Sequence, residues 1–392
     1  MRTVSDLERR TRLARRHHLA RPVAHVDTVA ADLLGLHSSD PASVYLAARA
    51  RVRRFMPSDL ERSLYEERSL VRMLGMRRTM FVVTREGAAL MDAACTQALA
   101  SGERRRFAGI LEEQAIAPDG AAWITRAARA TLAELAARGE ATAAELSRSL
   151  PELRQKLHVG AGKKWEGTVG VSTRLLFLLA AEGRIVRGRP LGSWISSQYR
   201  WALTTSWLDG ALATIAPSIA RAELARCYLW AYGPATLVDL AWWTGWTQRT
   251  AKAAIGALDT TVVALDDGSN AMLLTDDLAP VRRPAPWVAF LPALDPTVMG
   301  WKSRGWYLGD HQEALFDTNG NAGPTIWADG HIVGGWAQVG NEIAIRLLEP
   351  VAVETRQMIK REAARLRSWL GDLRFTPRFR TPLERELSAV QP

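Results

Sequence analysis

The chain has little cysteine, little lysine and no long apolar run. Its 392 residues include two cysteines, Cys95 and Cys227, which are far apart and show no metal-ligand spacing. This excludes a disulfide framework and a cysteine-based zinc site. No apolar stretch approaches the roughly 20 residues that a membrane-spanning helix needs. The arginine-rich residues 1–21 lack the apolar segment of a secretory signal. These absences predict a cytoplasmic protein that binds no membrane.

Several catalytic motifs are also absent. Residues 160–164 lack the glycine spacing of a phosphate-binding loop, and the seven histidines include no His-Glu-x-x-His pattern. There is no Gly-x-Ser-x-Gly nucleophile elbow either. The sequence therefore argues against kinases, serine hydrolases and metalloenzymes, and it predicts neither a metal nor a cofactor.

What the chain has in excess is arginine. It carries 51 basic and 41 acidic residues, a net charge of +10, and only six of the basic residues are lysines. Guanidinium groups bind phosphate in a bidentate manner, so this excess indicates a polyanionic partner, most often nucleic acid. A GC-rich genome, which favours arginine and alanine, explains the same bias without nucleic acid. The charge alone does not decide between these explanations.

The clearest pattern of elements lies between residues 219 and 275. Three helical stretches are followed by a β-hairpin, at residues 219–231, 236–244, 247–258, 260–265 and 271–275. Gly245 suits the tight turn before the third helix, and Thr247 suits its N-terminal cap. This order is typical of a winged helix-turn-helix.

Helices followed by short strands recur upstream. In the middle of the chain they are expected at residues 122–137, 142–150, 171–182 and 184–203. At the front they are expected at residues 4–17, 28–34, 41–53, 57–66, 70–74 and 79–83. The economical interpretation is three tandem winged-helix units, over residues 1–118, 119–205 and 206–283. Trp242, Trp243 and Trp246 are expected to pack in the core of the third unit or between units.

The pattern changes after the proline-rich residues 280–286. Short apolar stretches separated by turn residues follow at 287–291, 314–316, 325–328, 331–338 and 342–347, and a helix is expected at 354–370. Such spacing indicates a small barrel or sandwich. The predicted fold is therefore α+β, with three winged-helix units, a C-terminal β-barrel with a closing helix over residues 284–375, and a tail over 376–392.

Residues 35–41, Gly-Leu-His-Ser-Ser-Asp-Pro, contain a second kind of signal. Asp40 before Pro41 predicts a helix start, because the carboxylate accepts unpaired N–H groups and proline suits the first helical position. His37 and Ser39 are therefore expected on a short loop at a helix N-terminus, where small polar groups meet a ligand. A plain helix cap and a surface histidine explain the same residues without any chemistry.

Several further segments resemble, in order, those of the AlkZ/YcaQ-type winged-helix DNA glycosylases. They are residues 76–80, 232–236, 291–296, 300–302, 324–330 and 333–336. Residues 35–41 resemble the catalytic loop of that family, but His37 and Ser39 stand where the family has Gln-x-Gln or Gln-x-Asp. The resemblance implies a concave basic channel for duplex DNA with this loop at its centre. It also implies a monofunctional DNA glycosylase of base excision repair, without metal, that acts on bulky N-alkylated purines such as N7-alkylguanine.

On this resemblance the catalytic residues are His37, Ser39 and Asp40. His37 can act as a base or hold a water, because the pKa of histidine ordinarily lies near neutral. Ser39 can hold a water, and Asp40 is the carboxylate beside them. The candidate DNA-binding residues are Arg49, Arg51, Arg53, Arg77, Arg78, Lys163, Lys164, Arg187, Arg189, Lys302, Arg304, Asn319 and Asn321. An ordinary surface position is the competing interpretation for each of them.

The expected partner is double-stranded DNA carrying alkylated bases, which would associate the protein with the nucleoid. No obligate protein partner is predicted. The competing function is a non-catalytic winged-helix DNA-binding or regulatory protein, which would use a recognition helix in the major groove.

Overall fold

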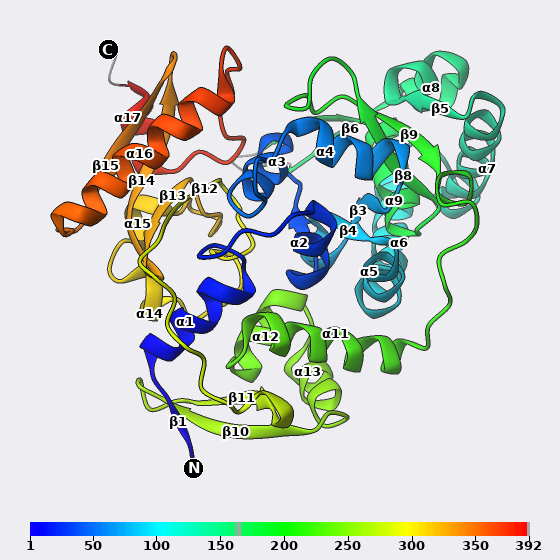
Figure 1. Ribbon diagram of the computed structural model, residues 1–392. Helices are drawn as coiled ribbons and strands as arrows, with labels where there is room; N and C mark the ends of the chain where they lie inside the picture. The colour runs from blue at the N-terminus through cyan, green and yellow to red at the C-terminus, as the bar shows by residue number, and fades with distance from the viewer. Residues whose placement is uncertain (161, 163–165, 390–392) are drawn as a thin grey trace.

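The computed structural model describes residues 1–160, 162 and 166–389, which form five small β-sheets and the helices around them (Figure 1). The first sheet has the strand order β2 (Leu36–His37), β4 (Met80–Thr84), β3 (Leu70–Leu74). Its helices are α1 (Asp6–Arg16), α2 (Val26–Asp32), α3 (Pro41–Arg49), α4 (Pro57–Glu61), α5 (Arg85–Met91) and α6 (Gln97–Glu113). Two π-helical turns, η1 (Arg62–Glu66) and η3 (Asp92–Thr96), continue α4 and α5, and a 3-10 turn, η2 (Met76–Arg78), joins β3 to β4. The predicted helices and strands of this region are found.

The expectation that His37 lies on a loop is wrong. His37 belongs to β2, where it is paired with Phe81 of β4 in an antiparallel register. The pairing joins residues more than 40 positions apart in the sequence, so the local turn signals of residues 35–41 do not reveal it.

The second region contains a three-stranded sheet and a separate hairpin. The sheet has the order β5 (Glu140–Thr142), β9 (Tyr199–Leu203), β8 (Ile185–Pro190), and the hairpin consists of β6 (Lys156–Val159) and β7 (Gly167–Gly170). The helical elements are α7 (Gly120–Arg138), α8 (Ala143–Ser149), η4 (Pro151–Arg154), α9 (Val171–Ala181) and α10 (Thr204–Trp207). The β6–β7 hairpin has no counterpart in the sequence-based prediction.

The third region follows the predicted order of three helices and a hairpin. The elements are α11 (Pro217–Tyr232), α12 (Leu237–Thr244), α13 (Gln248–Ile255), β10 (Thr260–Leu265) and β11 (Asn270–Leu274). Gly245 ends α12 in the left-handed conformation, with φ of 77°, and the Thr247 hydroxyl accepts a hydrogen bond from the Thr250 N–H. Strand β1 (Thr3–Val4) pairs in parallel with β10, which brings the start of the chain to this hairpin (Figure 1).

The C-terminal sheet is antiparallel and has the order β12 (Val288–Leu291), β13 (Thr325–Ala328), β14 (His331–Val339), β15 (Glu342–Leu347). Within the described ranges β12 and β15 do not pair with each other, so we find an open sheet there and no closed barrel. The remaining elements are η5 (Thr275–Asp277), α14 (Gly305–Leu308), α15 (Gln312–Leu315), α16 (Val353–Leu370) and α17 (Pro382–Ala389).

The strand expected at residues 314–316 is wrong. Residues Gln312–Leu315 form the short helix α15, and Phe316 makes a single isolated bridge with Ala322. The turn between Phe316 and Ala322 is closed by this single bridge. A short apolar stretch is as consistent with the end of a buried helix as with a strand, so the local pattern does not separate the two.

One continuous apolar core extends from α1 through α2, α3 and α11 to the C-terminal sheet, and a second lies within residues 107–201. In Figure 1, α2 and α3 lie at the centre of the molecule, between the C-terminal sheet on the left and the β8–β9 region on the right, with α11–α13 below. Among the described residues, no helix combines the length and apolar character needed to cross a membrane. Because α2 and α3 lie between these regions, the segment that joins the two helices lies where the regions meet.

Candidate functional site

The segment between α2 and α3 is fixed against strand β4 by its backbone. Gly35 has φ of 113°, and a side chain there would lie 2.7 Å from the Val83 Cγ1 atom, so this position requires glycine. The Ser38 N–H donates to the Met80 carbonyl at 2.8 Å. The Ser39 hydroxyl oxygen in turn accepts a hydrogen bond from the Met80 N–H at 3.1 Å. His37 and Ser39 are thus carried on an ordered edge of the first sheet.

His37 is almost fully buried, with 5% of its surface exposed. Its ring lies 5.1 Å from the Phe81 ring, centroid to centroid, and the Ser39 N–H approaches its Nδ1 atom at 3.5 Å. Burial, and secondarily the charge of Arg77, lower the pKa of His37 to about 3. The imidazole is therefore neutral at physiological pH. With Nδ1 facing an N–H group, the ring carries its proton on Nε2.

Asp40 caps helix α3, as the sequence predicts. Its Oδ1 atom accepts a hydrogen bond from the Ala42 N–H at 3.0 Å, and its Oδ2 atom accepts one from the Arg378 N–H at 2.9 Å. Burial raises the pKa of the Asp40 carboxyl group, and these backbone hydrogen bonds oppose that shift. Both carboxylate oxygens are therefore engaged, one by α3 and one by the segment that precedes α17.

The prediction that Arg51 contacts DNA is contradicted by its burial. Arg51 is 0% exposed and forms an ion pair with Asp295, with 2.6 Å between Nη2 and Oδ1. It also donates to the Thr297 hydroxyl and to the carbonyls of His17 and Ala47. Its position in the helical pattern suggested a solvated face, but the acidic partner lies 244 residues away in the sequence.

Arg77 and Arg304 are brought together at the ring of Trp242. The Arg77 Cζ atom lies 4.0 Å from the ring centroid and the Arg304 Cζ atom 4.8 Å from it. Arg304 is 9% exposed and also lies over the Phe316 ring at 4.7 Å. Trp242 itself is half-buried. Burial, together with the charge of Arg304, lowers the pKa of Arg77 to about 10. Trp242 therefore packs between regions, as expected, but against charged groups.

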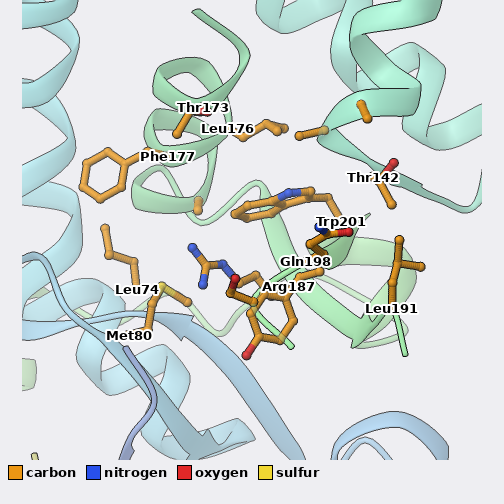
Figure 2. Close-up of a pocket in the computed structure, with 15 residues that line it drawn as sticks. Leu74, Met80, Thr142, Thr173, Leu176, Phe177, Arg187, Leu191, Gln198 and Trp201 are labelled. Atoms are coloured by element: carbon orange, nitrogen blue, oxygen red, sulfur yellow. The ribbon is translucent and has the colours of Figure 1, made fainter. Parts of the chain in front are cut away.

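Arg187 is half-buried and lines a cavity, and its contact with DNA stays a prediction. Its Cζ atom is 5.1 Å from the ring centroids of both Tyr199 and Trp201. These side chains line a cavity of about 450 Å³ that Leu74 and Met80 also border, and Figure 2 shows Arg187 beside Trp201 in this cavity. Burial lowers the pKa of Arg187 to about 10.

Three other basic candidates are engaged by acids, and two of them, Arg78 and Arg189, are at the surface. Arg49 pairs with Glu362 at 2.5 Å, Arg78 with Glu103 at 3.2 Å, and Arg189 with Glu61 at 3.0 Å. Ion pairs at the protein surface contribute little free energy, so a DNA phosphate can replace the acidic partner of Arg78 or of Arg189.

The remaining candidates are less constrained or cannot be placed. Arg53 and Lys302 are exposed. Asn319 is exposed in the turn that Asp317 organises, and the side chain of Asn321 is held there by the Asp317 Oδ2 atom at 2.8 Å. Lys163 and Lys164 lie outside the described residues.

The functional features that the sequence left unnoticed are aromatic. The stacking of Arg77 and Arg304 on Trp242 joins residues from separate regions. No local spacing signals these contacts, since a tryptophan on an apolar helix face predicts core packing equally well.

Comparisons with known proteins show the family of the chain. A family model described as "DNA glycosylase AlkZ-like" matches residues 30–369, from within α2 to within α16. Among solved structures, that of the DNA glycosylase AlkZ from Streptomyces sahachiroi is similar, with a TM-score of 0.72 over 95% of this chain and 98% of that one. The sequence identity is 20%, so this likeness shows the shared fold alone. Among curated proteins, none gives a significant match. The matched family model covers most of the chain, including His37 and Ser39, and the chain therefore belongs to the AlkZ-like DNA glycosylase family.

Proposed function

We propose that the chain is a monofunctional DNA glycosylase that hydrolyses the N-glycosidic bond of N7-alkylguanine and other bulky N-alkylated purines in duplex DNA. The observation that carries this proposal is the placement of a neutral His37 and of Ser39, whose N–H faces the His37 ring, on a sheet edge within the region that the family model matches. We further propose that the three sets of helices with their short strands are winged-helix units that hold the duplex.

The chemistry demands little of the protein. An N7-alkylated guanine already carries a positive charge, so the base takes the electron pair of the C1′–N9 bond and leaves as a neutral molecule. Water then forms a bond to C1′ of the resulting oxocarbenium-like sugar, and its proton passes to the solvent. The protein has to orient that water and stabilise the sugar cation.

His37 and Ser39 offer complementary hydrogen-bonding groups for such a water. The His37 Nε2–H can donate to the water oxygen. The Ser39 oxygen uses one lone pair for the Met80 N–H and has a second with which to accept a water hydrogen. This leaves one lone pair of the water free to approach C1′. Because the pKa of His37 is about 3, the imidazole is too weak a base to remove the proton, and we assign it to holding the water.

Asp40 is proposed to position the site. Its two oxygens accept the N–H groups of Ala42 and Arg378, so they fix the start of α3 and the C-terminal segment relative to His37. Its negative charge would also stabilise the sugar cation from a distance, without touching the sugar. The departure from the family's amide-rich pair therefore retains water-binding groups without a free carboxylate.

The proposed DNA surface includes the basic side chains that are exposed or can exchange their acidic partners. These are Arg53, Arg78, Arg189 and Lys302, together with Asn319. Arg77, which is half-buried, and Arg304, which is buried, are treated below. If several of the exposed residues contact phosphates, affinity for duplex DNA falls steeply as salt is raised.

The test is base release from a duplex that contains one N7-methylguanine or one bulky N7-alkylguanine. Alkali-labile strand breaks measure the release. We expect His37→Ala to slow release at least about tenfold, because the water loses a positioning contact, and Ser39→Ala to slow it less. His25→Ala is the matched control, since His25 is exposed and makes no side-chain cap contact.

The opposite result identifies the competing function. If the wild type binds the duplex but releases neither adduct faster than the duplex does alone, the chain is a DNA-binding protein without glycosylase activity.

A further inference from the structure

Two arginines that are distant in the sequence converge on Trp242 without an acidic partner. Arg77 lies in η2 between β3 and β4, Trp242 lies in α12, and Arg304 directly precedes α14. Within the described part of the chain, neither arginine forms an ion pair with Asp or Glu. The Arg77 Nε and Arg304 Nη2 atoms are buried without a hydrogen-bond partner there. Buried polar groups are normally satisfied, and buried charges are normally paired.

The backbone around Arg77 is held in an unusual conformation. Arg77 and Arg78 have φ of 51° and 64°, in the left-handed region that non-glycine residues seldom adopt. The stem of Arg77 packs over Gly245, where a side chain would lie 3.1 Å from the Arg77 Cγ atom. Two consecutive strained residues persist only where surrounding contacts hold them, and such strain clusters at functional sites. Here the strained turn places the Arg77 guanidinium on Trp242.

The turn that carries Arg77 is connected directly to the proposed catalytic residues, because η2 leads into β4 and the Met80 backbone of β4 bonds Ser38 and Ser39. The charge of Arg77 contributes to the lowered pKa of His37, and the charge of Arg304 contributes to the lowered pKa of Arg77. Two like charges are thus held near each other and near the neutral His37. An anion bound beside them would relieve their repulsion. The Nη atoms of Arg77 are not among the buried unpaired atoms, and we assign them to that anion.

We propose that Arg77 and Arg304, stacked on Trp242, together bind one phosphodiester group of the strand that carries the damaged nucleotide, and so hold that nucleotide beside His37. Planar guanidinium groups match the oxygens of a phosphate, and the aromatic ring fixes their planes before the ligand arrives. The damaged-strand assignment rests on the proposed function, whereas the binding of a phosphodiester does not.

The experiment measures affinity by fluorescence anisotropy on duplexes in which a single phosphate around one N7-methylguanine is replaced by an uncharged methylphosphonate. We expect the wild type to lose about tenfold in affinity at one or two linkages close to the lesion. Arg77→Gln and Arg304→Gln should weaken binding to the unmodified linkage by a similar factor. They should also lower the slope of log K against log salt by about 0.9, and lose the sensitivity to those linkages.

The matched control is Arg129→Gln, which removes one exposed arginine of α7 that has no ion pair among the described residues. It should bind the series of duplexes as the wild type does. Trp242→Phe keeps an aromatic ring and should retain the linkage sensitivity, whereas Trp242→Leu should lose it. Arg304→Lys keeps the positive charge at this position and is a second, more conservative variant in case Arg304→Gln does not fold. Thermal unfolding of every variant is compared with that of the wild type.

The proposal is overturned if Arg77→Gln and Arg304→Gln keep the wild-type sensitivity to each methylphosphonate. It is also overturned if inorganic phosphate at matched ionic strength abolishes DNA binding equally in the wild type and in both variants. Arg77 and Arg304 would then make no contribution to phosphate binding that the variants lack. A chain that shows the linkage pattern but releases no base would disprove the proposed glycosylase activity and leave the phosphodiester site standing.

Discussion

Two clusters of this molecule, one fully buried and one partly buried, differ in charge balance. The closed cluster consists of His17, Arg51, Asp295 and Thr297. The open cluster consists of His37, Arg77, Trp242 and Arg304. Each joins a histidine and arginine from distant segments, but only the closed cluster contains a carboxylate.

In the closed cluster every polar group is satisfied by the protein. The five hydrogen bonds of the Arg51 guanidinium equal its five N–H donors and go to Asp295, Thr297 and two carbonyls. The His17 Nδ1 atom bonds the Thr297 hydroxyl at 2.8 Å, and its Nε2 atom faces the Ala231 carbonyl at 3.2 Å. No group is left for a ligand, so this cluster is structural.

The open cluster leaves donors unused beside the proposed reaction site. The same residue types therefore serve different purposes, and the difference lies in whether the protein supplies the counter-ion. A member of a DNA glycosylase family meets its counter-ions on the substrate, which is a polyanion. The following predictions test that distinction.

The largest effect is expected from Asp295→Ala, which breaks the closed cluster. Removing one partner of a buried ion pair leaves an uncompensated charge and typically costs about 3–5 kcal/mol. Chemical denaturation should show this as a lower transition midpoint. Asp276→Ala is the control, because Asp276 is exposed and should stay within about 0.5 kcal/mol of the wild type. A loss of less than about 1 kcal/mol for Asp295→Ala would mean that the cluster is not closed as described.

The second effect is the pH dependence that His37 gives to stability. The pKa of His37 is about 3 in the folded chain and near 6.5 in the unfolded chain. Between these values the unfolded chain binds a proton that the folded chain refuses, so the free energy of unfolding falls as the pH is lowered. Its contribution is fully present above pH 6.5 and shrinks by at most about 1.4 kcal/mol per pH unit below it.

His37→Gln removes that titration. The difference in unfolding free energy between the wild type and this variant should therefore shift by about 1 kcal/mol from pH 6.5 to pH 5.5, in the direction that disfavours the wild type at the lower pH. His25→Gln, at an exposed position, should follow the wild type throughout. Parallel curves for the wild type and His37→Gln would show that His37 is not held neutral.

The sequence predicts the elements of these clusters better than the clusters themselves. The cap at Asp40, the turn at Gly245 and most helices are local, since their signals lie within a few residues of the feature they predict. The pairing of His37 with Phe81 and of Arg51 with Asp295 depends on distant segments that local patterns do not connect. A helical arginine is as consistent with a phosphate contact as with a buried ion pair, and only the fold distinguishes Arg51 from Arg77.

The smallest effect on stability is expected from Arg77→Gln, and its smallness is what separates the clusters. Removing one of two unpaired like charges relieves repulsion and desolvation, while it forfeits the stacking on Trp242, worth about 0.5–2 kcal/mol. These terms oppose each other, so the unfolding free energy should stay within about 1 kcal/mol of the wild type. Chemical denaturation of the Arg77→Gln and Asp295→Ala variants under the same conditions measures this difference between the two clusters. If Arg77→Gln lowers the unfolding free energy as much as Asp295→Ala does, Arg77 is a structural residue like Arg51. The protein itself would then compensate the charge of Arg77, and no phosphate would be needed for that purpose.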